Sequence, residues 1–215
     1  MAANGFTGSV KPSKHKLKRD PQNACHRFKS LGKNHVWSYD FVADRTDQGR
    51  RIRFLNVVDE FTRECLTIEA RRSYTGKDVV NTLAELFVIR GRPCYIRSYN
   101  GPEFIGDDVK KWLVANFVGT IFVEPASPWQ NGYIESFNGK FRNECLNGEL
   151  FTSRLEAQYV ADRWRLDYNH NRPHMLLPGH ITPAMYAKNC RDFSRKWLGF
   201  VPEDVKIQNA VKIPI

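Results

Sequence analysis

Two acidic residues stand where an unpartnered charge is unfavourable. Asp40 lies in the middle of an apolar run, between Tyr39 and Phe41, and burying a carboxylate there is costly unless the acid is paired or binds a metal. Glu135 follows a glycine-containing loop and lies early in a segment with helical periodicity. Both acids are therefore candidate metal ligands or catalytic groups.

A polar stripe accompanies Glu135 along its predicted helix. Glu135, Asn138 and Arg142 share one helix face because they are spaced i, i+3 and i+7. An acid, an amide and a cation on one face could hold a metal and contact phosphates. A solvated helix surface presents the same pattern, so the stripe alone leaves both interpretations open.

The secondary structure that must position these residues follows from periodicity and turn signals. Three successive strands joined by short turns predict an antiparallel meander at residues 36–46, 51–59 and 64–70. Two more strands are predicted at residues 94–98 and 120–125, and helices at residues 76–90, 107–117, 132–147 and 153–168. This order predicts an α/β fold with a mixed five-stranded sheet flanked by helices.

Local signals support several of these boundaries. Thr75 with Asp78 three residues on is a capping-box variant that starts the first helix, and Gly91 ends it. Asp59 ends the second strand and is expected to cap the turn that follows. The last predicted helix carries four large side chains, namely Leu155, Tyr159, Trp164 and Leu166.

The charge of the chain is unevenly placed. The formal net charge is +10, and residues 1–35 hold eight Lys and Arg, with Lys14, Lys16, Lys18 and Arg19 clustered, against one Asp. A basic leader ahead of a nearly neutral domain suits a polyanion, because each cation near a phosphate adds affinity by counterion release. A solvated, disordered leader is the alternative that the composition leaves open.

The composition also excludes some classes of protein. No run of 18 or more apolar residues predicts a membrane span, and the start of the chain has no apolar signal region. We therefore expect a location in the bacterial cytoplasm or nucleoid. The five cysteines are far apart and form no C-x₂-C pair, which indicates neither a disulfide framework nor a zinc site.

Three segments together resemble a known family. WSYDF at 37–41, SYNGPEF at 98–104 and QNGYIESFNGKFRNECLN at 130–147 resemble the active-site blocks of insertion-sequence transposases of the retroviral-integrase type, and DYNHNRPH at 167–174 resembles their C-terminal block. The resemblance implies an RNase H-like fold and a triad of acids holding two Mg²⁺ or Mn²⁺ ions. It also implies that the protein cuts and joins DNA.

One of the three acids is missing. The motifs align Asp40 with the first acid and Glu135 with the last, and 35 residues separate Glu135 from position 99. The family has its second aspartate at that position, whereas this chain has Tyr99. A tyrosine, with an ordinary pKa of about 10, is a neutral phenol at neutral pH. We therefore expect catalytic activity to be abolished or crippled, so whether the chain is an enzyme stays open.

Other acids are poor substitutes for the missing one. Glu103 is also present in the family motif beside its own aspartate, and Asp107 and Asp108 are typical of a helix N-terminus. An active enzyme that uses a rearranged acid is accordingly the weakest interpretation. A non-catalytic remnant that binds DNA or oligomerises is the main alternative to a crippled transposase.

The resemblance also implies partners and a division of the chain. DNA (element ends and target) and further copies of the chain are the expected partners, with Asn138, Lys140 and Arg142 as candidate DNA contacts beside the basic leader. Ordinary surface cations are the alternative for Lys140 and Arg142. We predict a disordered leader at residues 1–35, a catalytic core at 36–187 and a tail at 188–215.

Overall fold

The computed structural model describes residues 28–99, 106–123 and 131–193. Within these ranges the strands are β1 (Val36–Arg45), β2 (Arg51–Asp59), β3 (Cys65–Arg71), β4 (Tyr95–Tyr99) and β5 (Gly119–Val123). The α-helices are α1 (Gly76–Arg90), α2 (Asp107–Ala115), α3 (Gly132–Phe141), α4 (Arg154–His170) and α5 (Pro183–Asn189). Each helix in the described ranges is too short or too polar to serve as a membrane span.

The strands form one mixed sheet in the order β3-β2-β1-β4-β5. β1 lies in its centre, antiparallel to β2, with Asp40 directly opposite Asn56. On its other side β1 runs parallel to β4, and the last pair in that ladder is Ser38 with Arg97. The predicted meander and the mixed five-stranded sheet are confirmed.

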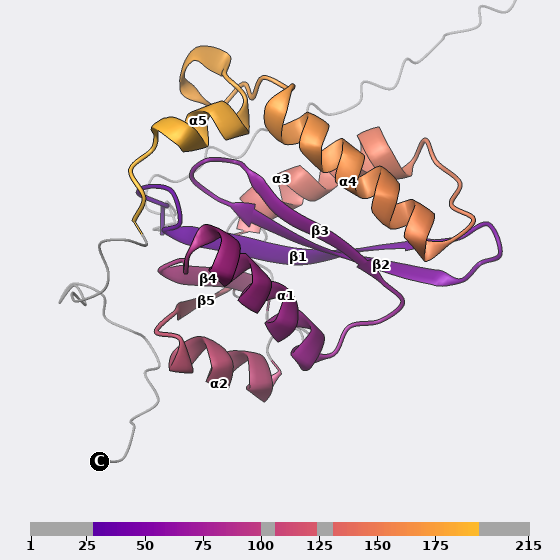
Figure 1. The fold of residues 1–215 in the computed structure, drawn as a ribbon, viewed down its shortest axis with the longest axis horizontal. Coiled ribbons are helices and arrows are strands. Elements are labelled where there is room, and N and C mark those ends of the chain that lie inside the picture. The colour runs from indigo at the N-terminus through magenta and orange to yellow at the C-terminus, as the bar shows by residue number, and fades with distance from the viewer. Residues whose placement is uncertain (1–27, 100–105, 124–130, 194–215) are drawn as a thin grey trace, which may run out of the picture.

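Helices cover both faces of this sheet (Figure 1). α1 and α2 pack on one face, where Trp37 and Leu83 belong to a buried core. α3 and α4 pack on the other, where Phe54 and Phe141 belong to a second core. Because side chains alternate along a strand, Asp40 points to the α3 side, opposite to Trp37. The sheet therefore directs this acid toward the helix that carries the other predicted acid.

Two local predictions are confirmed. Thr75 caps α1, and Thr75 and Asp78 form the reciprocal capping box. The Asp59 carboxylate caps the β2–β3 turn, because its Oδ1 accepts the backbone N–H groups of Phe61 and Thr62, each at 2.9 Å. Its Oδ2 accepts the N–H of Asn34 at 2.7 Å. Both oxygens of this buried acid are thus engaged in structural hydrogen bonds.

Side chains of α4 cover the exposed edge of β3. The Gln158 amide donates to the carbonyl of Ile68 (2.8 Å) and accepts from the N–H of Ala70 (2.6 Å). Asn169 makes the same reciprocal pair with the backbone of Cys65, at 2.9 and 2.8 Å. An uncovered edge strand would offer these groups to another chain. α4 therefore blocks pairing at this edge.

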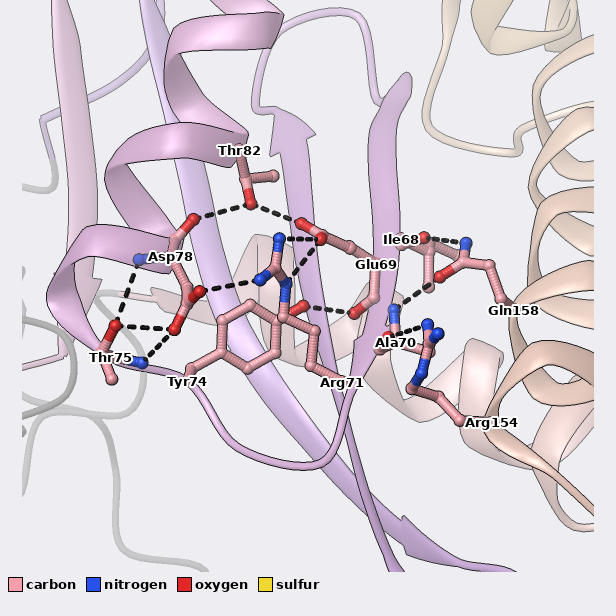
Figure 2. A network of polar contacts seen from close by, with 10 residues as sticks. All are labelled: Ile68, Glu69, Ala70, Arg71, Tyr74, Thr75, Asp78, Thr82, Arg154 and Gln158. Atoms are coloured by element: carbon pink, nitrogen blue, oxygen red, sulfur yellow. Dashed lines mark hydrogen bonds and ion pairs between the residues drawn. The ribbon is translucent and has the colours of Figure 1, made fainter.

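Polar contacts also connect β3 to α1 (Figure 2). Arg71 forms ion pairs with Glu69 and Asp78, at 2.6 and 2.7 Å, and the hydroxyl of Thr82 donates to Glu69. Figure 2 shows this cluster on one side of β3 and Gln158 with Arg154 on the other. The edge strand is therefore held from both sides.

The structure corrects the prediction at the C-terminal side. The helix ending near residue 168 is not the last, because α5 follows with Thr182 as N-cap and Pro183 in its first turn. A Thr-Pro pair is a known helix start, so the signal was present in the sequence. Three of the four large residues noted on α4 are exposed, and only Trp164 is buried.

The predicted helix at residues 132–147 is also not uniform. α3 ends at Phe141, and residues 142–146 form a π-helical segment. Both Cys145 and Leu146 are buried there. A wider turn shifts the residues that face inward, which apolar spacing alone does not reveal.

Candidate functional site

The central strands bring two predicted positions into register. The β1–β4 ladder ends at Ser38 and Arg97, and Asp40 and Tyr99 each lie two residues further on. Because alternate residues share a face, both side chains point to the side on which α3 packs. Tyr99 and Asp40 are both half-buried.

Tyr99 contacts the acid on α3 directly. Its hydroxyl donates a hydrogen bond to Oε1 of Glu135, in the first turn of that helix. The structure thus brings Asp40, Tyr99 and Glu135 together beside α3, and we call these three residues the carboxylate pocket. The phenol occupies one of the two carboxylate oxygens of Glu135.

Two amides connect the other acid to the same helix. The amide of Asn138 donates to Oδ2 of Asp40 at 2.9 Å. Its own oxygen accepts from the amide of Asn56 at 2.7 Å. Asn138, predicted as a DNA contact, therefore has its side chain turned toward the carboxylate. Asn56, which the structure buries fully, was missed by the sequence analysis, although an amide within the apolar run RIRFLNVVD was a signal of its own.

The environment of Asp40 disfavours its ionised form. Burial raises the pKa of this carboxyl to about 6, the hydrogen bond from Asn138 lowers it, and the charge of Glu135 raises it again. At neutral pH Asp40 is ionised, at a cost to the folded state.

This cost predicts a pH-dependent gain in stability for Asp40→Asn. The pKa of Asp40 is about 6 in the folded protein, against an ordinary 3.8, so the folded state holds the proton more tightly. Stability is therefore lost as pH rises from about 4 through 6. Because the carboxyl is only partly buried, we expect less than the full effect of this shift. Asp40→Asn should raise the free energy of unfolding by about 1–2 kcal/mol at pH 7.5. The gain should vanish near pH 3.5.

Urea unfolding at a series of pH values measures this difference. Asp47→Asn, in the exposed β1–β2 turn, is the matched control and should change stability little at any pH. A gain for Asp40→Asn that stays constant between pH 4 and 7.5 would contradict the assignment of the cost to this carboxylate.

The described side chains do not fit a two-ion site. No group of three or more His, Cys, Asp or Glu in the described ranges could hold a metal ion. Oδ1 of Asn56 is buried without a hydrogen-bond partner beside the pair of acids, but a neutral amide oxygen does not replace the charge of a carboxylate. Asp59 is committed to its turn, and Glu103 lies outside the described residues.

A buried ion pair lies next to the carboxylate pocket and holds the strands that carry it. Arg97 and Glu60 pair at 2.7 Å, with side chains 2% and 0% exposed. Ser38 donates to Glu60, and Arg97 also donates to the carbonyl of Phe28 at 2.7 Å. Ser38 and Arg97 are the residues two positions before Asp40 and Tyr99. This pair, which the sequence analysis missed, fixes the strands on which both pocket residues stand.

The predicted DNA contacts lie in different places. Arg142 is exposed and donates to the carbonyl of Ala43 at 3.1 Å, and Lys140 is half-buried on α3. Arg172, in the DYNHNRPH segment, forms ion pairs with Glu144 and Asp167. Lys14, Lys16, Lys18 and Arg19 lie outside the described residues.

Comparison with protein families matches both halves of the fold. Two family models, each described as an integrase core domain, match residues 31–128 and 117–183. The two matches overlap at residues 117–128, and together they span the sheet and the helix with Glu135.

Several proteins encoded by insertion elements are similar to this chain in sequence. The chain is 46% identical over 158 residues to an uncharacterized 39.2 kDa protein of insertion element IS476 from Xanthomonas euvesicatoria, covering 74% of this chain and 45% of that protein. It is 42% identical to a 31.7 kDa protein of IS407 from Burkholderia multivorans, covering 74% and 57%. It is 24% identical to the transposase InsF for IS3A of Escherichia coli, covering 74% and 56%. The chain thus spans about half the length of these relatives.

Solved structures share the fold at low identity. The HTLV-2 integrase catalytic core domain in complex with magnesium aligns with a TM-score of 0.61 at 16% identity, covering 74% of this chain and 99% of that one. A chain of the simian T-cell lymphotropic virus intasome aligns with a TM-score of 0.66 at 19% identity, covering 86% and 63%. The predicted RNase H-like fold is confirmed.

Proposed function

The chain belongs to the integrase core domain family of transposases and integrases, and we propose that it is the catalytic core of an insertion-element transposase crippled by Tyr99. The contact between the Tyr99 hydroxyl and Glu135 carries this proposal. This contact supports a site in which three residues are arranged as the family's three acids would be, with a neutral phenol in place of the second acid.

The size of the expected defect follows from the family's chemistry. Divalent ions held by three acids stabilise both the attacking and the leaving oxygen when a phosphodiester is cut or joined. Tyr99 removes one negative charge, places a ring in the pocket and occupies an oxygen of Glu135. A metal position is worth several kcal/mol of transition-state stabilisation, so its loss costs on the order of 10³-fold in rate.

Strand transfer tests the proposal. With element ends supplied and Mg²⁺ or Mn²⁺ present, the chain should form little product, whereas Tyr99→Asp should recover some. Equal rates for the two forms would contradict a defect at position 99. Salt-dependent DNA binding without joining by either form, lost on removal of residues 1–35, would favour a non-catalytic DNA-binding remnant.

DNA is the partner that the proposal requires, as element ends and as target, in the bacterial cytoplasm or nucleoid. The support is the basic leader, together with Lys140 and Arg142 on the helix that carries Glu135. Mg²⁺ or Mn²⁺ is the cofactor expected once an acid is restored at position 99.

Self-association is part of the same proposal. Leu155, Tyr159 and Leu166 lie on the outward side of α4 and are 68%, 62% and 50% exposed. A twofold axis between Asp162 and Arg163 would set Tyr159 of one antiparallel helix opposite Leu166 of its copy, and Asp162 opposite Arg163. On this face of α4 each apolar residue would meet an apolar residue of the copy, and each charge would meet the opposite charge. Such self-complementarity is what a symmetric dimer needs.

Tyr159→Glu should therefore raise the dissociation constant of a dimer about tenfold or more, because it places a charge in an apolar contact. Sedimentation equilibrium measures this constant. Val114→Glu, an equally exposed apolar position on α2, serves as control and should leave it unchanged. A monomeric parent chain at all concentrations would refute self-association through α4.

A further inference from the structure

Three cationic or hydrogen-bond-donating side chains gather beside α3, outside the carboxylate pocket. They are Arg63 in the β2–β3 turn, Lys140 on α3 and His174 after α4, and we call them the Arg63 cluster. Tyr168 joins two of them, because its hydroxyl donates to the carbonyl of Arg63 at 3.2 Å and its ring lies 6.5 Å from that of His174.

The backbone of Arg63 is held in an uncommon conformation. Its φ is +63°, in the left-handed region that glycine and asparagine adopt more readily. Its N–H donates to the carbonyl of Asp59 at 2.9 Å, while its own carbonyl accepts from Tyr168. The turn therefore fixes the direction of a long cationic side chain at a position where a smaller residue would fit with less strain.

The charge of Arg63 is not compensated by an acid. The guanidinium lies over the ring of Tyr133, with its central carbon 3.7 Å from the ring centroid. Its Nε and Nη1 are buried without a hydrogen-bond partner. In the described part of the chain neither Arg63 nor Lys140 forms an ion pair, whereas Arg90, Arg97 and Arg172 all do. The side chain of Arg63 as a whole is half-buried, and a guanidinium without a paired acid at such a place favours an anionic ligand.

The neutral ring of His174 adds a hydrogen-bond donor to the Arg63 cluster. Its Nδ1 accepts the backbone N–H of Leu176 at 3.3 Å, which leaves the ring proton on Nε2. Burial, then the charges of Lys140 and Arg63, lower the pKa of His174 to about 4. The charges of both cations thus bear on this ring, and Tyr168 links the ring to the turn that holds Arg63.

The surface of α3 is open between these groups. Tyr133 and Lys140 lie on one helix face at i and i+7, with Ser136 and Gly139 exposed between them. A Cβ built on Gly139 would meet no atom within 4 Å. Ser136 follows Glu135 directly, so this face adjoins the carboxylate pocket.

We propose that Arg63, Lys140 and His174 bind a backbone phosphate of the DNA strand that runs past the carboxylate pocket. The inference rests on the proposed function, which supplies the DNA. A phosphate provides several acceptor oxygens for the guanidinium, the ammonium and the imidazole N–H at once. A strand crossing the open face at Gly139 reaches Glu135 within one helical turn.

DNA binding as a function of salt tests the Arg63 cluster. Anisotropy with a 20-base-pair duplex gives the slope of log K against log salt, which falls by about 1 for each lost phosphate contact. Arg63→Gln and Lys140→Gln should each reduce the slope by about 1 and weaken binding about threefold to tenfold in 0.1 M KCl. Lys77→Gln, exposed on α1 across the sheet, removes the same charge and should change neither quantity.

A second probe separates this inference from the proposed function. Pyrophosphate titrated into ¹⁵N-histidine-labelled chain should shift the His174 ring signals, assigned with His174→Gln, and the shift should disappear in Arg63→Gln. DNA binding whose slope is unchanged in both variants overturns the cluster but leaves the function intact. No DNA binding, with a pyrophosphate shift that depends on Arg63, contradicts the function and retains the phosphate site. No shift and no binding overturns the cluster.

Discussion

The Tyr99→Asp variant should unfold at a lower temperature than the parent in EDTA and should regain stability when Mn²⁺ is added. The substitution removes the hydrogen bond from Tyr99 to Glu135 and places a third carboxylate beside two that already interact. Burial and the charge of Glu135 raise the pKa of Asp40, so a further negative charge is unfavourable there. We expect a loss of about 1–3 kcal/mol without metal.

Divalent ions should reverse this loss in the variant alone. A ligand that binds only the folded state stabilises it by about 2.7 kcal/mol at one hundred times its dissociation constant. Three acids form an anionic cage for such an ion, and the two acids with the phenol do not. Calorimetric melting with EDTA, Mg²⁺ and Mn²⁺ measures both effects.

Two control variants isolate the cause. Tyr99→Phe removes the hydroxyl without adding charge, so it should lose some stability and gain none from Mn²⁺. Adding Glu135→Gln to Tyr99→Asp should abolish the response to metal. If Mn²⁺ stabilised the parent chain as much as the variant, the pocket would hold metal despite Tyr99, and the explanation of the defect would be wrong.

The Arg97→Met variant is expected to lower the free energy of unfolding by about 3–5 kcal/mol. The substitution keeps most of the side-chain volume but leaves Glu60 as a buried carboxylate that has lost its cation. It also removes the donor to the carbonyl of Phe28. Since a small domain is stable by only about 5–15 kcal/mol, a loss of this size is close to unfolding.

Urea unfolding of Arg97→Met beside Arg172→Met provides the matched comparison. Arg172 also pairs with carboxylates, but its side chain and those of Glu144 and Asp167 are all more than a third exposed. Exposed pairs contribute up to about 1 kcal/mol. Equal losses for the two variants would show that burial of the Arg97–Glu60 pair has no special weight.

Much of the architecture was predictable because its signals are local. Alternating apolar residues marked the meander, and Thr75 with Asp78 marked the start of α1, because these patterns act over a few neighbouring residues. The α5 helix was missed although Thr182 and Pro183 carry a start signal. On α4 the small residues Ala157 and Ala161 are buried while most of the large apolar ones are exposed, because large apolar residues are a poor guide where helices pack closely.

By itself the sequence determined the fold class and the three positions that form the pocket, since motif spacing identifies Asp40, Tyr99 and Glu135. Only the tertiary structure decided how these residues are held. Asn138 meets Asp40 across 98 positions and Asn56 across 82, and Arg97 meets Glu60 across 37. No periodic pattern records such contacts, because they depend on how strands and helices pack after each has formed. The packing of the sheet against α3 therefore decides three features of the site. It decides how much the ionised form of Asp40 costs, whether the Tyr99 hydroxyl contacts Glu135, and whether the guanidinium of Arg63 is left unpaired.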